Sequence, residues 1–115
     1  MYKAFVKPLL FRLSPDEIHE STVRWMAEAS ESATALKLAE WIYNYQAPEL
    51  RQEILGLEFR NPVGLAAGFD KNGKLGPVIE AAGFGFLEVG SITAAASAGN
   101  PKPRTFRLEE ELSLI

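Results

Sequence analysis

Two short apolar runs, each bounded by glycine, restrict the folds open to this chain more than any other feature. They are Val63–Ala67 and Phe86–Gly90, and both are typical of strands buried on both faces of a sheet. The segment between them, Lys74–Ala82, has a helical pattern, although Gly76-Pro77 makes its start irregular. Strand, helix and strand in this order predict a βαβ unit with parallel strands and a right-handed crossover. This half of the chain is therefore expected to be α/β.

The first part of the chain has a helical pattern instead. Apolar residues recur at helical spacing over 2–13, where Pro8 limits the segment to a short or kinked helix. Ser14-Pro15-Asp16-Glu17 predicts the start of a second helix, with Ser14 as N-cap, Pro15 at the first position and Glu17 completing a capping box. A third helix is expected over about 34–43.

Shorter elements and loops follow the helices. The segment 53–59 contains two apolar pieces around Gly56 and predicts a small hairpin. Residues 93–103 lack periodicity and contain several breakers, which indicates a loop. A short extended segment is expected over 104–108, and Glu109-Glu110-Glu111 should be solvated.

The stretch Gly64–Lys74, GLAAGFDKNGK, contains the P-loop spacing G-x-x-x-x-G-K between a strand and a helix. Leu75 stands where a P-loop has the Ser or Thr hydroxyl that binds magnesium. Asp70 would also place a carboxylate where phosphate should bind, and like charges repel. A dinucleotide fingerprint fails as well, because Gly83-Phe84-Gly85 has no third glycine at the required spacing.

A ligand site at the strand ends is the remaining interpretation. Ligands of parallel α/β folds bind at the carboxyl ends of strands, and Ala66-Ala67-Gly68 would let a flat ring approach the backbone. Lys71 would add a positive charge suited to an anionic flavin, an anionic substrate, or both. Ser91 follows the second strand and could donate to the same ligand. The alternative is that Asp70 and Lys71 are only loop charges.

Composition excludes several classes of protein. The net charge of -3 gives no sign of a nucleic-acid binder. The absence of cysteine and the single histidine leave no basis for a disulfide framework or a metal site. No apolar run approaches the roughly 20 residues that span a bilayer, and no signal peptide is evident. The apolar ending Ser113-Leu114-Ile115 indicates a chain cut inside a longer fold.

Two features of the helical part have alternative interpretations. Lys3, Lys7 and Arg12 make the first segment basic and amphipathic, which suits an anionic membrane surface. On its sequence alone, however, the segment is better explained as a helix that buries its apolar face within its own domain. His19 lies at the edge of an apolar stripe, where a lone imidazole is more often packed or solvated than functional.

Four stretches together make the chain resemble a known family. Asn61–Gly73, NPVGLAAGFDKNG, and Gly83–Thr93, GFGFLEVGSIT, resemble the first two strands of the class 2, quinone-dependent dihydroorotate dehydrogenases. Gly99–Leu108, GNPKPRTFRL, is similar to the loop that follows these strands. Leu13–His19, LSPDEIH, is similar to the helical extension that distinguishes class 2 from class 1. The resemblance covers essentially the whole chain.

This resemblance implies a flavoenzyme built on a (β/α)₈ TIM barrel that binds FMN at the carboxyl ends of its strands. Such an enzyme oxidises dihydroorotate to orotate in de novo pyrimidine (UMP) biosynthesis and passes the electrons to a membrane quinone. Residues 1–46 would then be a helical extension forming a quinone tunnel on the membrane, and 47–115 the truncated start of the barrel. The expected location is peripheral, on the cytoplasmic side of the bacterial inner membrane.

The resemblance also assigns roles to individual residues. Lys71 should bind the substrate carboxylate as well as the flavin. His19 and Arg107 should hydrogen-bond a quinone carbonyl in the tunnel, and Arg104 is a weaker candidate that would bridge tunnel and barrel. The residues expected to line the FMN are Ala67, Gly68, Phe69, Asp70, Lys71 and Ser91.

Two departures from the family pattern matter. Ala94–Ala98 replaces a loop that usually carries proline and charge, which leaves the packing of that loop in doubt. A barrel needs about 250 residues, and the family's general-base serine and phosphate-binding glycines would come after Ile115. We therefore expect this piece alone to be unstable and inactive. The alternative function is a non-catalytic module that docks on a membrane or a partner.

Overall fold

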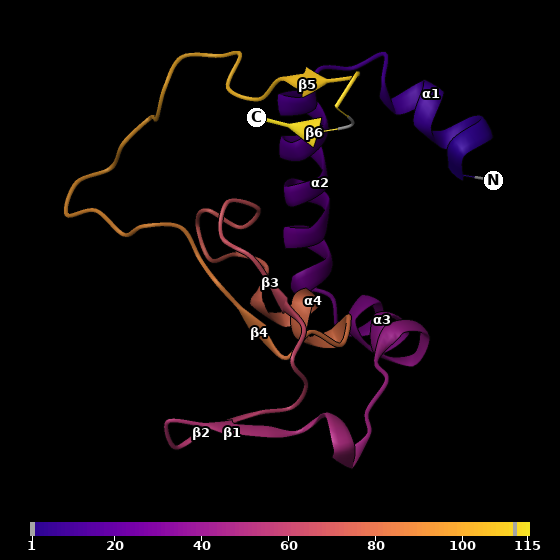
Figure 1. Cartoon of the computed structure of the whole chain (residues 1–115), viewed down its shortest axis with the longest axis vertical. Helices are drawn as coiled ribbons and strands as arrows, with labels where there is room; N and C mark the ends of the chain where they lie inside the picture. Colours follow the sequence, from indigo (N-terminus) through magenta and orange to yellow (C-terminus); the bar gives the residue numbers. More distant parts are fainter. Residues whose placement is uncertain (1, 112) are drawn as a thin grey trace. The chain divides into compact units, whose positions relative to one another are not determined.

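The computed structural model describes residues 2–111 and 113–115 (Figure 1). The chain forms two compact units, one made of Met1–Thr22 with Thr93–Ile115 and the other of Val23–Ile92. Helix α2 (Pro15–Ser30) contributes its first half to one unit and its second half to the other.

The first unit combines the two ends of the chain. A π-helical turn, η1 (Tyr2–Val6), leads into α1 (Lys7–Leu10) and then into the start of α2. Near the other end, β5 (Arg107–Leu108) and β6 (Ser113–Leu114) pair antiparallel, with Arg107 opposite Leu114. The expected short helix in the first segment is confirmed. The extended segment expected over 104–108 is confirmed at Arg107–Leu108, but the sequence did not predict its partner β6.

The predicted capping box at the start of α2 is present. The Glu17 N–H donates to Ser14 Oγ at 3.2 Å, and the Ser14 N–H donates to Glu17 Oε2 at 2.9 Å. Two N–H groups that the first turn of a helix leaves without partners are thereby satisfied. The capping motif therefore fixes where α2 begins.

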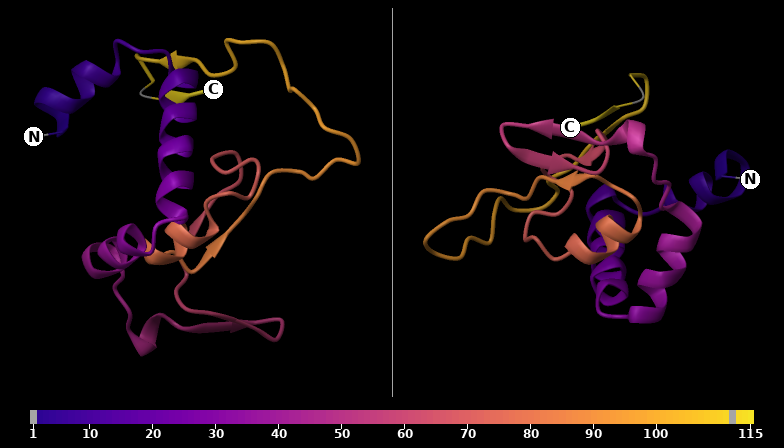
Figure 2. Two further views of the ribbon diagram at one scale, coloured as in Figure 1. Left: turned by 180° about the vertical axis from the view of Figure 1, so that it is seen from behind. Right: turned by 90° about the horizontal axis from the view of Figure 1, so that it is seen from below.

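The second unit contains α3 and the strands that the sequence predicted (Figure 2). Helix α3 (Ala33–Tyr43) is capped by Ser32, whose Oγ accepts the Ala35 N–H. After η2 (Pro48–Leu50), β1 (Gln52–Ile54) and β2 (Leu57–Phe59) form the predicted antiparallel hairpin. Its turn residues, Leu55 and Gly56, both have positive φ, 52° and 76°, which matches the right-handed twist of a tight hairpin.

The βαβ unit is also confirmed. Strands β3 (Gly64–Leu65) and β4 (Phe86–Leu87) are parallel, with Gly64 opposite Phe86, and α4 (Gly76–Ala81) lies between them in the chain. A Cβ on Gly64 would collide with the Phe86 ring. The glycine therefore makes room for the aromatic side chain opposite it.

The core of this unit consists of Leu75, Val78 and Ile79, which are buried at and within α4. Leu65 and Leu87 pack against it from the strands. The opposite face of the strands is partly open: Phe86 is 44% exposed, and Val63, just before β3, is 60% exposed. The expectation that both strands are buried on both faces was therefore wrong for the described chain, because packing covers only one face of this two-stranded sheet.

Residues from the helical part of the chain contribute to the core of the second unit. Val23 and Met26 of α2 and Leu36 of α3 pack against the core around Leu75. Residues of α2 and α3 and the start of the strands thus share one core, and the division between the compact units falls within α2. Among the described residues, no helix has the length and apolarity needed to cross a bilayer.

Candidate functional site

The loop after β3 turns sharply at its beginning. Ala66 and Ala67 are exposed, and Gly68 has φ +100°, a conformation that side chains rarely permit. The space where a Cβ of Gly68 would project contains no atom within 4 Å. Small side chains and open backbone therefore coincide at the carboxyl end of β3, as a planar ligand such as a flavin ring would require.

Asp70 shapes the middle of this loop. Its side chain is only 1% exposed, and its two carboxylate oxygens accept the backbone N–H groups of Lys74 at 3.0 Å and Leu75 at 2.7 Å. The carboxylate closes the loop onto the start of α4. If Asp70 contributes to a flavin site, as expected from the sequence, its backbone is the part available, since the carboxylate is already used.

Lys71 is exposed, and its main chain packs against the end of the second strand. A Cβ on Gly90 would lie 2.7 Å from the Lys71 carbonyl oxygen and 3.0 Å from its Cα. Ser91, the next residue, is exposed. The structure therefore brings Lys71 and Gly90 together beyond the carboxyl ends of β3 and β4, where ligands of parallel α/β folds bind.

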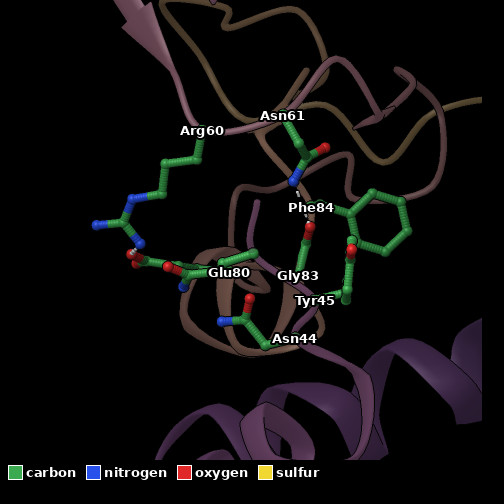
Figure 3. A pocket seen from close by; sticks show the side chains of 8 residues that line it. Asn44, Tyr45, Arg60, Asn61, Glu80, Gly83 and Phe84 are labelled. Atoms are coloured by element: carbon green, nitrogen blue, oxygen red, sulfur yellow. Dashed lines mark hydrogen bonds and ion pairs between the residues drawn. The ribbon is translucent and has the colours of Figure 1, made fainter. Parts of the chain in front are cut away.

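A polar hollow lies at the opposite end of the same strands (Figure 3). Its lining includes Arg60, Asn61, Glu80 and Gly83, and its volume is about 10 Å³, room for roughly one water molecule. Asn61 Nδ2 donates to the Gly83 carbonyl at 2.6 Å, and Arg60 pairs with Glu80 at 2.6 Å. Because Asn61 and Gly83 precede the strands, these contacts join their amino ends and stabilise the fold rather than bind a ligand.

The two residues expected in a quinone tunnel, His19 and Arg107, both belong to the first unit. Each is half-buried. Arg107 donates to the carbonyls of Leu13 at 2.9 Å and Phe11 at 3.4 Å, and its guanidinium lies 4.4 Å from the centre of the Phe11 ring. Arg107 therefore binds the chain between α1 and α2 through hydrogen bonds and a cation–π contact.

Arg104, the weaker candidate, has a local role. Its guanidinium donates to the carbonyls of Asn100 at 2.6 Å and Ala98 at 2.8 Å, which closes the loop before β5. Its backbone N–H donates to Asp16 Oδ2 at 2.7 Å. Lys102 in the same loop pairs with Glu20 at 2.6 Å. This loop is thereby fastened to the first turns of α2.

The buried Asp16 was not singled out from the sequence as more than a helix-start residue. The pKa of its carboxyl lies below the ordinary value of 3.8, chiefly because it accepts the Arg104 backbone N–H, with a further hydrogen bond from Thr105. Only the folded chain brings Arg104 to this carboxylate, so no local sequence signal could have indicated the contact.

We expect this contact to weaken in acid. Because the folded-state pKa is depressed, the stabilisation is complete above the unfolded value of 3.8 and is lost as the pH falls through the lower folded value. Hydrogen exchange should therefore show protection of the Arg104 amide falling in that window. Asp16→Asn should reduce the protection already at neutral pH and flatten its pH dependence. An unchanged pH dependence in the variant would contradict the assignment.

The described residues contain no group of three or more His, Asp or Glu side chains arranged to hold a metal ion.

Gly90 is the residue of the strand-end site that sequence reasoning missed. Its importance depends on a close approach between segments that are far apart in the chain, and nothing in its local sequence indicates such an approach.

The family model described as dihydroorotate dehydrogenase matches residues 49–115. The dihydroorotate dehydrogenase (quinone) of Helicobacter acinonychis is 46% identical over 114 residues, which are 99% of this chain and 32% of that protein. The one from Christiangramia forsetii is 41% identical over 115 residues, covering 100% of this chain and 34% of that protein.

A solved structure shows the same likeness. The crystal structure of the Eimeria tenella DHODH in complex with ferulenol superposes with a TM-score of 0.72 at 39% identity, covering 89% of this chain and 25% of that one. The chain thus spans about a third of the length of the named relatives that it matches.

Proposed function

Because the chain belongs to the dihydroorotate dehydrogenase family, we propose that the full-length protein oxidises dihydroorotate to orotate with FMN and a membrane quinone, in pyrimidine biosynthesis. The observation that carries this proposal is the packing of Lys71 against Gly90 beyond the ends of β3 and β4, next to the exposed Ala67 and Gly68. The relatives named as quinone enzymes, which match nearly the whole chain, support the choice of quinone as acceptor.

The flavin site that we propose uses the two strand ends. Ala67, Gly68, Phe69 and the backbone of Asp70 would lie along the flavin, with Lys71 and Ser91 donating to it. FMN, when bound, supplies the acceptor for the hydride of the substrate. The chain's own part is to hold the ring at a place where Gly68 leaves the backbone uncovered.

Lys71 has the chemistry needed to recognise the substrate. Dihydroorotate and orotate are carboxylates, and an ammonium group forms a charge-assisted hydrogen bond with a carboxylate. The side chain of Lys71 is exposed, while its backbone is packed against Gly90. A fixed main chain with an accessible ammonium group suits a binding residue that must meet substrate and flavin together.

The remaining parts of the proposal concern the whole protein. We assign the (β/α)₈ barrel to the region that begins near residue 47 and the quinone tunnel to residues 1–46, with His19 and Arg107 as its polar residues. The first segment presents Phe5 at 75% and Leu9 at 63% exposure alongside basic residues, which suits peripheral contact with anionic lipid. We propose a peripheral location on the cytoplasmic side of a bacterial inner membrane.

The test is made on the purified full-length protein. It should be yellow, release FMN on denaturation, and reduce a quinone analogue when dihydroorotate is added. A colourless protein that binds anionic vesicles but neither FMN nor orotate would favour the docking module instead.

The quinone assignment needs a separate measurement. His19→Ala should slow quinone reduction while leaving reduction of the flavin by dihydroorotate near its original rate, because the two half-reactions use different residues. Stopped-flow absorbance of the flavin measures the rates of flavin reduction by dihydroorotate and of flavin reoxidation by quinone separately. Equal loss of both half-reactions would remove His19 from the quinone site.

A further inference from the structure

We propose that Gly90 and Asp70 are positioning residues that fix the main chain of Lys71 from two sides. This inference rests on the proposed function, in which Lys71 binds flavin and substrate. Neither residue needs to present its side chain to a ligand for this role. Gly90 acts by having no side chain, and Asp70 acts through a carboxylate that is turned into the protein.

The contact at Gly90 is with backbone and cannot be relieved by a change of rotamer. A Cβ at this position would lie 2.7 Å from the Lys71 carbonyl oxygen, 3.0 Å from its Cα and 3.3 Å from its carbonyl carbon. Real Cβ atoms do not approach backbone oxygen this closely, so any side chain would push Lys71 away from β4. The requirement for glycine here is one of space, because φ of Gly90 is not in the left-handed region.

Asp70 provides the second constraint. Its carboxylate, 1% exposed, holds the N–H groups of Lys74 and Leu75, and Leu75 is itself fully buried in the core. The loop is therefore fixed at Asp70 and at Leu75. Lys71 follows Asp70 directly. Its Cα is therefore held on one side by the hydrogen bonds of the Asp70 carboxylate, which we call the Asp70 clamp, and on the other side by Gly90. Such a cation meets its ligand with little reorganisation, since its position is set before binding.

The decisive experiment compares Gly90→Ala with Gly76→Ala in the full-length protein. A Cβ at Gly76 would meet no atom within 4 Å, and its φ is not left-handed, so this variant controls for the loss of a glycine. Gly90→Ala should raise the orotate Kd, measured by flavin absorbance, on the order of 10-fold, because misplacement by about 1 Å is costly at a binding site. It should also weaken FMN binding to the apoprotein, measured by flavin fluorescence. Gly76→Ala should change neither value.

A double-variant cycle with Lys71→Ala separates positioning from general damage. If Gly90 acts through Lys71, Gly90→Ala should add little to the orotate Kd once the lysine is gone. An undiminished effect in the Lys71→Ala background, or no effect of Gly90→Ala alone, would overturn the proposal. A wild-type protein that binds neither FMN nor orotate would instead overturn the proposed function on which it rests.

If Gly90→Ala does not fold, Asp70→Asn tests whether the position of Lys71 is fixed by its neighbours. The amide has the same shape, but its nitrogen cannot accept the N–H that the carboxylate oxygen accepts. We expect the orotate Kd to rise severalfold, again only when Lys71 is present. Wild-type orotate binding in Asp70→Asn would contradict the clamp.

Discussion

Lys71→Ala in the full-length protein should raise the KM for dihydroorotate between about 10-fold and 100-fold, because hydrogen bonds to charged groups contribute roughly 1.5–3 kcal/mol. The orotate Kd should rise by a similar factor, and the flavin should dissociate more readily on gel filtration. The KM for quinone should stay near its wild-type value, since quinone is assigned to residues of the other unit. Steady-state kinetics with each substrate varied in turn provides the measurement.

The neighbouring Lys74 offers a matched control. It is also exposed, and its contact with Asp70 is made by the backbone N–H rather than by the ammonium group. Lys74→Ala should therefore leave both KM values unchanged. If Lys74→Ala raised the dihydroorotate KM as much as Lys71→Ala does, the loop would act by its overall charge and the assignment of Lys71 would be wrong.

Leu75→Ala should lower the free energy of unfolding by about 2–5 kcal/mol, the range for truncating a large buried aliphatic side chain. Leu75 is 0% exposed and lies at the centre of the core shared by α2, α3 and α4. Its truncation would leave a cavity at the point where the site loop ends. Urea unfolding of the full-length protein, followed by circular dichroism, measures the change.

Two further substitutions at Leu75 sharpen this test. Leu75→Met nearly conserves the volume and should cost less than about 1.5 kcal/mol. Leu75→Thr would complete the P-loop sequence pattern. It should nevertheless destabilise the protein and bring no ATP binding, because the side chain at this position faces the core. Measurable ATP binding by Leu75→Thr would revive the P-loop hypothesis.

The helical and hairpin elements could be predicted because their signals are local. The capping box around Ser14 and Glu17 is a chemical contact within one turn, and Leu55-Gly56 joins two short extended pieces. The partner strand β6 could not be predicted, because the chain after Leu108 continues with Glu109-Glu110-Glu111, which lacks the Gly, Asn or Asp that mark a hairpin turn. Burial of the strands was overestimated for a related reason: apolar composition says nothing about whether a covering layer is present.

The sequence points to candidate residues for the site, but it does not predict how the loop around them is built. Small side chains from Ala66 to Gly68, followed by Lys71, mark a strand end in the sequence itself. That the Asp70 carboxylate would turn inward and hold Leu75 could not be inferred, because a loop aspartate normally faces water. The role of Gly90 depends on contact with a residue on another strand end, which only the fold provides.

The composition of the two compact units has a consequence for synthesis on the ribosome. Residues 23–92 form one unit and are contiguous, so this unit can begin to assemble as soon as they leave the exit tunnel. The other unit needs Asp16 to meet Arg104 and Leu13 to meet Arg107, contacts that span most of the chain. These contacts of Leu13 and Asp16 can therefore form only after Arg107 has left the exit tunnel.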